Sequence, residues 1–251
     1  MSSQAAGAHF FTDAETDRYA RHLVLREIGG PGQQKLKAAR VLIVGAGGLG
    51  APAALYLAAA GVGRITLSDA DTVSLSNLQR QVLYAEADVG RAKTAAAAQR
   101  LAELNPHSAV TAAGAVTADN AAALMAGHDL VLDGTDSFET RLVVSDACLA
   151  AGVPLVTGAI GRWTGQVGVF AGKPCYRCLV PEVPPDAETC VAIGVVGALA
   201  GVVGAMMALE AVKLIVGAGQ PLTGRLLIYD GLAGETRTVK VGPDPACPAC
   251  G

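Results

Sequence analysis

Apolar and polar residues alternate in blocks along this chain, and the blocks predict strands followed by helices. The first apolar run, at 41–44, leads into glycines and then into a helix predicted over 51–60. The same order repeats with strands at 63–71, 108–116, 129–137 and 153–158, and with helices at 91–104, 121–126 and 140–151. Strands and helices that alternate at this spacing indicate an α/β fold with a Rossmann-like, doubly wound and mainly parallel sheet.

Two further segments flank this predicted core. Thr12 and Glu15 form a capping box, which predicts a helix through about residue 26 with Arg18 and Arg21 on one face. The sequence Gly-Gly-Pro-Gly at 29–32 is expected to break the chain before a short helix. Beyond Trp163, apolar or alternating runs at 164–172, 224–231 and 235–241 predict an antiparallel extension of the sheet.

We therefore expect residues 1–251 to form a single domain. Its parts would be an N-terminal helical arm at 12–40, a nucleotide-binding core at 41–160 and a C-terminal part at 161–251. The last part would hold the antiparallel strands, a connecting loop and a long apolar helix.

Composition narrows the class of protein. The net charge is −3 and no run of basic residues occurs, which argues against a nucleic-acid partner. Residues 1–11 lack a positive segment followed by an apolar one, so we expect a cytoplasmic location with reduced cysteines. The uncharged run at 191–209 is long enough to span a bilayer, but it is rich in Gly and Ala and leads into Glu210 and Lys213. It predicts a buried helix, on the sheet or across a subunit interface, with a membrane anchor as the alternative.

Residues that could bind a ligand or take part in catalysis lie where the predicted strands end. The loop GAGGLG, with Gly45, Gly47, Gly48 and Gly50, fits G-x-G-x-x-G between a strand and a helix, where backbone N–H groups can bind phosphate. Asp69 follows at the distance expected of a ribose ligand. An NAD-dependent oxidoreductase is therefore one interpretation, although its site needs no second carboxylate.

The polar residues that follow favour a triphosphate instead. Carboxylates can accept from hydroxyls or bind Mg²⁺, and cations neutralise a reacting triphosphate. Residues of both kinds occur in the expected positions: Asp71, Asn77, Arg80, Lys93 and Asp136.

Four of the six cysteines form two C-x-x-C pairs, Cys175 with Cys178 and Cys247 with Cys250. Four thiolates in this spacing suit tetrahedral Zn²⁺, which would be structural because all four positions are filled. Two redox pairs are the alternative, but such motifs open a helix in thioredoxin-like units, whereas Pro and Gly surround both pairs here.

These motifs together resemble the HesA/MoeB/ThiF family, relatives of ubiquitin-activating enzymes. The segments GAGGLG, DADTVSLSNLQRQ, GTDS and CYRCL carry the resemblance, with Ser137 where the family usually has Asn. It implies a nucleotidyltransferase that binds Mg·ATP and adenylates the C-terminal glycine of a small ubiquitin-like sulfur carrier protein. The second segment is closer to the molybdopterin-synthase activating branch, and the ending CPACG suits the thiamine branch equally.

The resemblance also implies roles for individual residues. Asp69 would hold the ribose, Asn77, Arg80 and Lys93 the phosphates, and Asp136 would act through Mg²⁺. Arg21 would reach the triphosphate of a partner subunit, which implies a homodimer. Cys190 would form a covalent bond with the carrier during sulfur transfer, or would have no essential role.

The resemblance extends to partners. Because the sequence ends at Gly251, we expect no fused rhodanese domain and a separate sulfur donor, such as a cysteine desulfurase or a rhodanese. Two alternatives to sulfur-carrier activation stay open: a tRNA-modifying enzyme that activates a carboxylate, and a scaffold that holds the carrier without catalysis.

Overall fold

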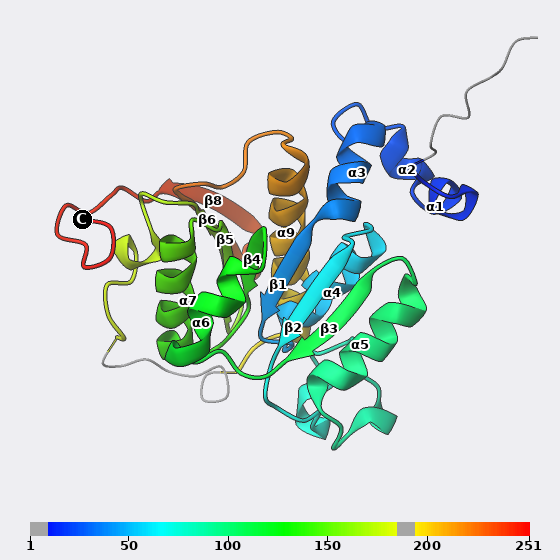
Figure 1. Ribbon diagram of the computed structural model, residues 1–251. Coiled ribbons are helices and arrows are strands. Elements are labelled where there is room, and N and C mark those ends of the chain that lie inside the picture. The colour runs from blue at the N-terminus through cyan, green and yellow to red at the C-terminus, as the bar shows by residue number, and fades with distance from the viewer. Residues whose placement is uncertain (1–9, 185–193) are drawn as a thin grey trace, which may run out of the picture.

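An eight-stranded sheet organises the protein (Figure 1). The computed structural model describes residues 10–184 and 194–251, so Cys190 lies outside the described residues. The strand order is β3-β2-β1-β4-β5-β6-β7-β8. The first five in this order pair in parallel: β3 (Ala109–Ala113), β2 (Arg64–Ser68), β1 (Arg40–Val44), β4 (Leu130–Asp133) and β5 (Leu155–Gly161). The last three extend the sheet in antiparallel: β6 (Thr164–Phe170), β7 (Arg225–Asp230) and β8 (Glu235–Lys240). The predicted fold class is confirmed.

Helices cover both faces of the sheet, because its central strands are apolar on both sides. In β1, Val41 and Ile43 belong to the core beneath α4 (Gly50–Ala59) and α9 (Gly197–Val216), which also includes residues of α5 (Lys93–Leu104). Leu42 and Val44 point the other way, into the core beneath α6 (Ala118–Ala126) and α7 (Phe138–Ala151). Figure 1 shows these two helices on the face of the sheet opposite α9. A strand buried on both faces reads as a continuous apolar run, which is the pattern seen at 41–44.

The long apolar helix α9 belongs to the core. Within the described residues it is long and apolar enough to cross a membrane, with a mean hydropathy of 2.0, yet half of that window is buried inside the protein. Gly204 allows close contact with α4, since a Cβ there would lie 2.4 Å from Pro52 Cγ. The Glu210 carboxylate accepts a hydrogen bond from the Leu222 N–H at 2.8 Å and pairs with Lys213. Packing of this helix on the sheet agrees with the prediction, although the helix begins at Gly197, within the predicted run at 191–209.

The N-terminal arm differs from the prediction of one helix through residue 26. Instead α1 (Asp13–Arg18) and α2 (Ala20–Leu23) are separate, and the predicted capping box opens α1. The chain turns at Tyr19, which is 4% exposed and whose hydroxyl accepts a hydrogen bond from Asn105 Nδ2 at 2.8 Å. Burial of this ring ends the first helix, so Arg18 and Arg21 lie on different helices.

The glycine-rich segment at 29–32 does not break the chain as predicted. It forms the first turn of α3 (Gly29–Ala38), with Pro31 in that turn. A proline costs no hydrogen bond there, because the first N–H groups of a helix have no partner within it.

Candidate nucleotide pocket and cysteine cluster

A cavity of about 660 Å³ opens at the carboxyl ends of the parallel strands, the edge at which doubly wound sheets bind ligands. It brings together most of the residues singled out from the sequence: Gly45, Gly47, Gly48, Asp69, Asp71, Asn77, Arg80, Lys93 and Asp136. Its volume is within the range of small-molecule sites. Residues separated by up to about ninety positions therefore share one pocket because their strands end at one edge.

The glycine loop joins β1 to α4 in a conformation that only glycine permits. Gly45 has φ of +86°, and a Cβ on Gly50 would lie 1.8 Å from the Gly45 carbonyl oxygen. Gly50 thus shapes the loop without lining the cavity, whereas Gly47 and Gly48 face it. Helix α4 begins directly after this loop, and the N-terminus of a helix suits a phosphate group.

Asp69 and Asp71 have different partners. The Asp69 carboxylate accepts hydrogen bonds from the Ala46 N–H at 2.8 Å and from the Asp71 N–H at 2.7 Å, so it fastens the glycine loop to the end of β2. Asp71 pairs with Lys93, with 2.8 Å between Oδ2 and Nζ. The Lys93 side chain is 6% exposed and that of Asp71 is 71% exposed. The second carboxylate is therefore the counter-ion of a buried lysine on the cavity wall.

The segment after β2 adds a cation and an amide. Arg80 follows the single turn η1 (Leu75–Asn77) and donates a hydrogen bond to the Ser76 carbonyl at 3.2 Å. Next to it, Gln81 is 3% exposed. Among the described residues, Gln81 Oε1 is the buried side-chain atom without a hydrogen-bond partner. A buried orphan acceptor is costly, so this wall of the cavity suits a ligand that supplies a donor, as a nucleotide does.

The loop after β4 carries Asp136 into the cavity and ends at Ser137. Ser137 caps α7: its hydroxyl oxygen accepts from the Thr140 N–H at 3.2 Å and the hydroxyl donates to Glu139 at 2.8 Å. Ser and Asn are both good N-caps, so the Ser found here keeps this helix start. The N-terminus of α7 is thereby a second helix end directed at the cavity.

Sequence reasoning missed several residues of the pocket. Arg141, Gln81, Gln166 and Tyr176 all line it. Arg141 stands in an ordinary helical pattern, so only its burial reveals it. Conversely, Arg21 is exposed on α2 and does not line the cavity. The structure of one chain thus separates Arg21 from the other predicted ligands.

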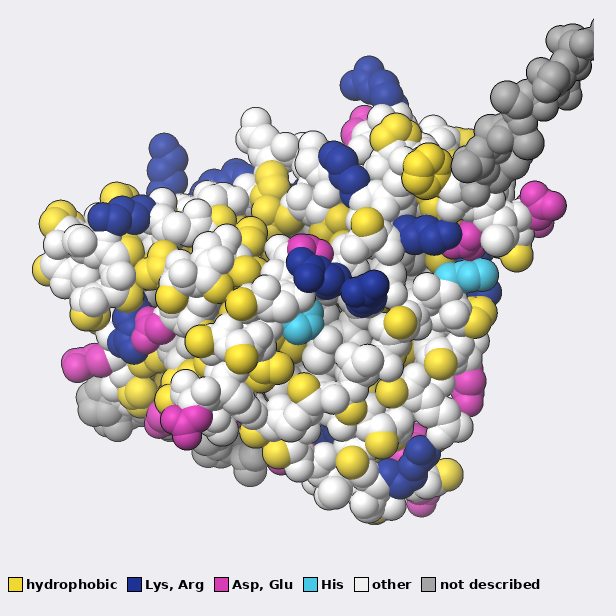
Figure 2. Space-filling model, viewed as in Figure 1, with side chains coloured by type: hydrophobic (Ala, Val, Ile, Leu, Met, Phe, Trp, Pro, Cys, Tyr) yellow, Lys and Arg dark blue, Asp and Glu magenta, His cyan; other side chains and the backbone are white. Residues whose placement is uncertain are grey.

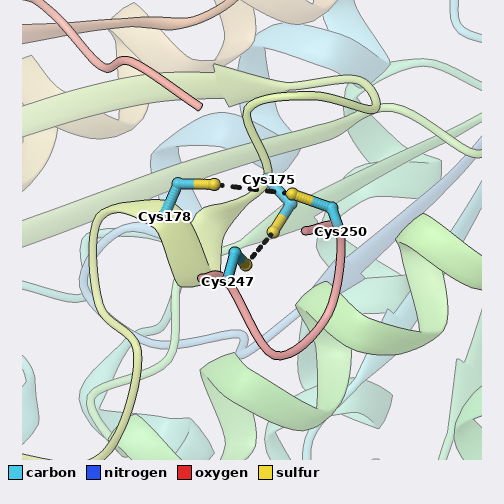
Figure 3. Close-up of side chains that lie close together, drawn as sticks. All are labelled: Cys175, Cys178, Cys247 and Cys250. Carbon is cyan, nitrogen blue, oxygen red and sulfur yellow. Dashed lines mark hydrogen bonds between the residues drawn. The ribbon is translucent and has the colours of Figure 1, made fainter. Parts of the chain in front are cut away.

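The four cysteines of the C-x-x-C pairs form one cluster (Figure 3). Cys175 and Cys178 lie at the turn η3 (Tyr176–Cys178), and Cys247 and Cys250 lie on the C-terminal loop. All four sulfur atoms lie within 4.8 Å of one another, and the Cys175–Cys247 and Cys178–Cys250 pairs are 3.5 Å apart. Tetrahedral Zn²⁺ with bonds of about 2.3 Å separates its sulfur ligands by about 3.8 Å. The cluster fits a zinc site.

The thiols of this cluster differ in acidity. Burial opposes ionisation of Cys247, but the N–H groups of Ala249 and Cys250 stabilise its thiolate and lower its pKa to about 7. Burial raises the pKa of Cys175 to about 12. A cation bound between the four sulfur atoms would favour ionisation of all four thiols.

A strand–glycine loop–helix unit with facing cations and carboxylates defines a nucleotide-binding α/β protein. The match of residues 19–249 to the ThiF family profile refines that class, and the chain belongs to the ThiF family. The resemblance inferred from the motifs is confirmed.

Three similar proteins match this chain over most of their own length and most of its length. The chain is 48% identical to molybdopterin-synthase adenylyltransferase of Escherichia coli K12, covering 96% of this chain and 98% of that protein. It is 47% identical to sulfur carrier protein adenylyltransferase of Thermus thermophilus, covering 96% and 93%. It is 45% identical to the SAMP-activating enzyme E1 of Haloferax volcanii, covering 94% and 89%.

Solved structures share the fold. The chain matches E. coli MccB with ATP at a TM-score of 0.79 and 25% identity, over 93% of this chain and 74% of that one. It matches MccB in complex with N-formylated MccA at a TM-score of 0.81 and 24% identity, over 98% and 77%. The second likeness concerns the fold alone.

Proposed function

We propose that this protein is an ATP-dependent adenylyltransferase, which activates the C-terminal glycine of a small ubiquitin-like sulfur carrier protein. The carrying observation is the pocket, where the glycine loop, the Lys93–Asp71 pair, Arg80 and Asp136 meet at one edge of the sheet. Relatives named adenylyltransferases that match nearly end to end support the same activity.

In this proposal the nucleotide lies along the glycine loop. Asp69 accepts from the ribose hydroxyls while the N-terminus of α4 faces the phosphates. Asn77, Arg80 and Lys93 bind the phosphates, and Asp136 binds Mg²⁺. When bound, Mg²⁺ would neutralise phosphate charge and orient the leaving pyrophosphate.

The reaction needs little proton transfer. A C-terminal carboxylate has a pKa of about 3.3–3.7 and is ionised at neutral pH. The obstacle is the repulsion between this anion and the α-phosphate, which Arg80, Lys93 and two helix N-termini offset. Attack of the carboxylate on the α-phosphorus gives the acyl-adenylate and releases pyrophosphate, with the two substrates held in line.

The pathway proposed for the carrier is molybdopterin (molybdenum cofactor) biosynthesis. The 48% identity to the E. coli enzyme supports it. Sulfur would come from a separate donor, and the protein would act in the cytoplasm. A thiamine-pathway carrier is the alternative, because the Thermus relative is named only for a sulfur carrier.

We further propose a homodimer whose pockets are completed in trans by Arg21. Arg21 is exposed on α2 and lies outside the pocket of its own chain. A guanidinium on an exposed helix can reach a neighbouring triphosphate only in an assembly. Mixing Arg21→Ala with Lys93→Met would then restore activity that neither variant has alone, since mixed dimers contain one intact pocket.

We propose that Cys175, Cys178, Cys247 and Cys250 hold a structural Zn²⁺, because their sulfur atoms surround a space of the right size. Metal analysis of the purified protein is expected to find one zinc per chain. Cys190 is not needed for adenylation and is kept as a candidate for the covalent bond with the carrier.

The test of the adenylation proposal is ATP–pyrophosphate exchange with Mg²⁺ and purified molybdopterin-type or thiamine-type carrier. Exchange is expected with the molybdopterin-type carrier and should vanish in an Asp136→Ala variant. Removing the last glycine of the carrier is the matched substrate control. Exchange with only the thiamine-type carrier would assign the protein to thiamine biosynthesis. Exchange with neither carrier would refute carrier adenylation.

A further inference from the structure

Helix α7 connects the nucleotide pocket to the cysteine cluster. Its N-terminus and Arg141 line the pocket. Further along the same helix, Asp146 accepts two hydrogen bonds from the Arg177 guanidinium, at 2.7 and 2.8 Å. Arg177 lies between Cys175 and Cys178, so one helix contacts both sites.

Arg141 fastens the loop that carries Asp136. Its side chain is 7% exposed, and its guanidinium donates to the carbonyl oxygens of Thr135 and, at 2.8 Å, Gly158. It also donates to Thr157 Oγ1 at 3.1 Å, and Asp133 Oδ2 lies 3.8 Å away as its counter-ion. The guanidinium therefore bridges the residue before Asp136 to strand β5, and its fork geometry makes several fixed bonds at once.

Tyr176 extends this arrangement to the cysteine cluster. It follows Cys175 directly, is 5% exposed and lines the pocket. Its ring packs edge-on against Phe170, with centroids 5.5 Å apart. Tyr176 and Arg141 thus lie on the wall of one pocket, with Tyr176 next to the cysteine cluster in the chain.

We propose that Arg141 is a positioning residue that holds the 134–137 loop for metal–nucleotide binding, and that Tyr176 couples this loop to the cysteine cluster. The inference rests on the proposed function, in which Asp136 binds Mg²⁺. Zinc bound by the cysteines would fix the backbone on both sides of Tyr176, and with it the part of the pocket wall that Tyr176 shares with Arg141. The zinc site then tunes nucleotide affinity although it lies outside the pocket.

The effect of Mg²⁺ on ATP affinity distinguishes a positioning role of Arg141 from general damage to the fold. ATP without Mg²⁺ uses the glycine loop, Asp69, Arg80 and Lys93, none of which bonds to Arg141. Asp136 contributes only to the increase in ATP affinity that Mg²⁺ produces. A positioning role therefore weakens Mg·ATP selectively, whereas general damage to the fold weakens both forms equally.

We would measure ATP affinity by calorimetry, with Mg²⁺ and without added Mg²⁺, for wild type, Arg141→Lys and Tyr176→Phe. Arg141→Lys keeps the charge but loses the fork, and is expected to weaken Mg·ATP about tenfold with less than about twofold change for free ATP. Tyr176→Phe is expected to weaken Mg·ATP about threefold. Arg40→Lys is the matched control, because Arg40 forms a similar forked pair with Asp129 outside the pocket.

Zinc depletion tests the coupling. Wild-type protein treated with a zinc chelator and returned to Mg²⁺ should lose Mg·ATP affinity selectively, while Arg141→Lys should lose little more. Equal weakening of both nucleotide forms, or no weakening, would overturn the inference. Wild-type protein that binds neither form of ATP would instead overturn the proposed function, and this inference with it.

Discussion

Replacing Lys93 with methionine should lower nucleotide affinity sharply without a matching loss of folding stability. The Lys93 side chain is 6% exposed, and its partner Asp71 is 71% exposed. Methionine keeps most of the aliphatic length and removes a buried charge, while Asp71 is left in contact with water. The free energy of unfolding without nucleotide should therefore stay within about 1 kcal/mol of wild type or rise.

Nucleotide affinity should fall sharply in the same variant. A hydrogen bond between an ammonium and a phosphate contributes about 1.5–3 kcal/mol, which corresponds to a loss of roughly 10- to 150-fold in affinity. The assays are urea unfolding without nucleotide and calorimetric titration with Mg·ATP, done on the same preparation.

The converse variant, Asp71→Asn, supplies the control. It leaves the buried ammonium without a carboxylate and should destabilise the free protein by about 1–3 kcal/mol, between the values for exposed and buried pairs. Bound triphosphate would replace the lost carboxylate, so saturating Mg·ATP should recover much of that loss. A Lys93→Met protein that is less stable by more than about 2 kcal/mol yet binds Mg·ATP like wild type would refute the assignment of Lys93 to the phosphates.

Three further predictions concern the glycine loop, the cysteine cluster and an ion pair outside the pocket. Gly50→Ala should destabilise by about 3 kcal/mol or more in thermal unfolding, because its Cβ would overlap the Gly45 carbonyl, 1.8 Å away; unchanged stability would contradict the loop geometry. Cys247→Ser should abolish stoichiometric zinc in metal analysis and lower the melting temperature, since a three-thiolate site binds less tightly; full zinc content would refute the four-ligand site. Asp129 has its pKa held below the ordinary value by hydrogen bonds from Arg40, so its stabilising contribution is present above about pH 4 and is lost as pH falls through the folded-state value. Asp129→Asn should thus cost under about 1 kcal/mol at neutral pH, and the difference from wild type in urea unfolding should narrow below about pH 4.

The order of strands and helices was predictable because the central strands are buried on both faces. Their apolar runs, as in β1 and β4, end at glycines or carboxylates that mark the same edge of the sheet. Local sequence was sufficient wherever a helix start or end depends on its own residues, as at Ser137 and at Gly152, which has φ of +65°.

Features set by distant contacts could not be predicted. The turn at Tyr19 depends on a hydrogen bond from Asn105, far along the chain. Arg141 has no distinctive spacing, and its role follows from carbonyl groups on two other segments. The partner of Asp71 was also hidden, because Lys93 reaches it only after α5 packs against the sheet. The types of the elements could thus be predicted from the sequence, whereas the contacts between distant residues could not.

Charged side chains of both signs lie on the outer surface. Figure 2 shows basic and acidic side chains interspersed on the face viewed, with no continuous basic area there. Counter-charges such as the Arg40–Asp129 pair offset each other locally. Charges of both signs also line the pocket: Asp69, Asp71, Arg80, Lys93, Asp136 and Arg141.

The antiparallel extension of the sheet has a consequence for the order of folding. Strand β6 pairs with β7, although η3 and α9 lie between them in the chain. Contacts between distant segments form slowly, because the loop that joins them must first be closed. We therefore expect the β7–β8 hairpin to dock after the parallel half of the sheet has formed. The C-terminal cysteines follow that hairpin in the chain, so the metal site would be completed last, and zinc would bind preferentially to chains that have already folded correctly.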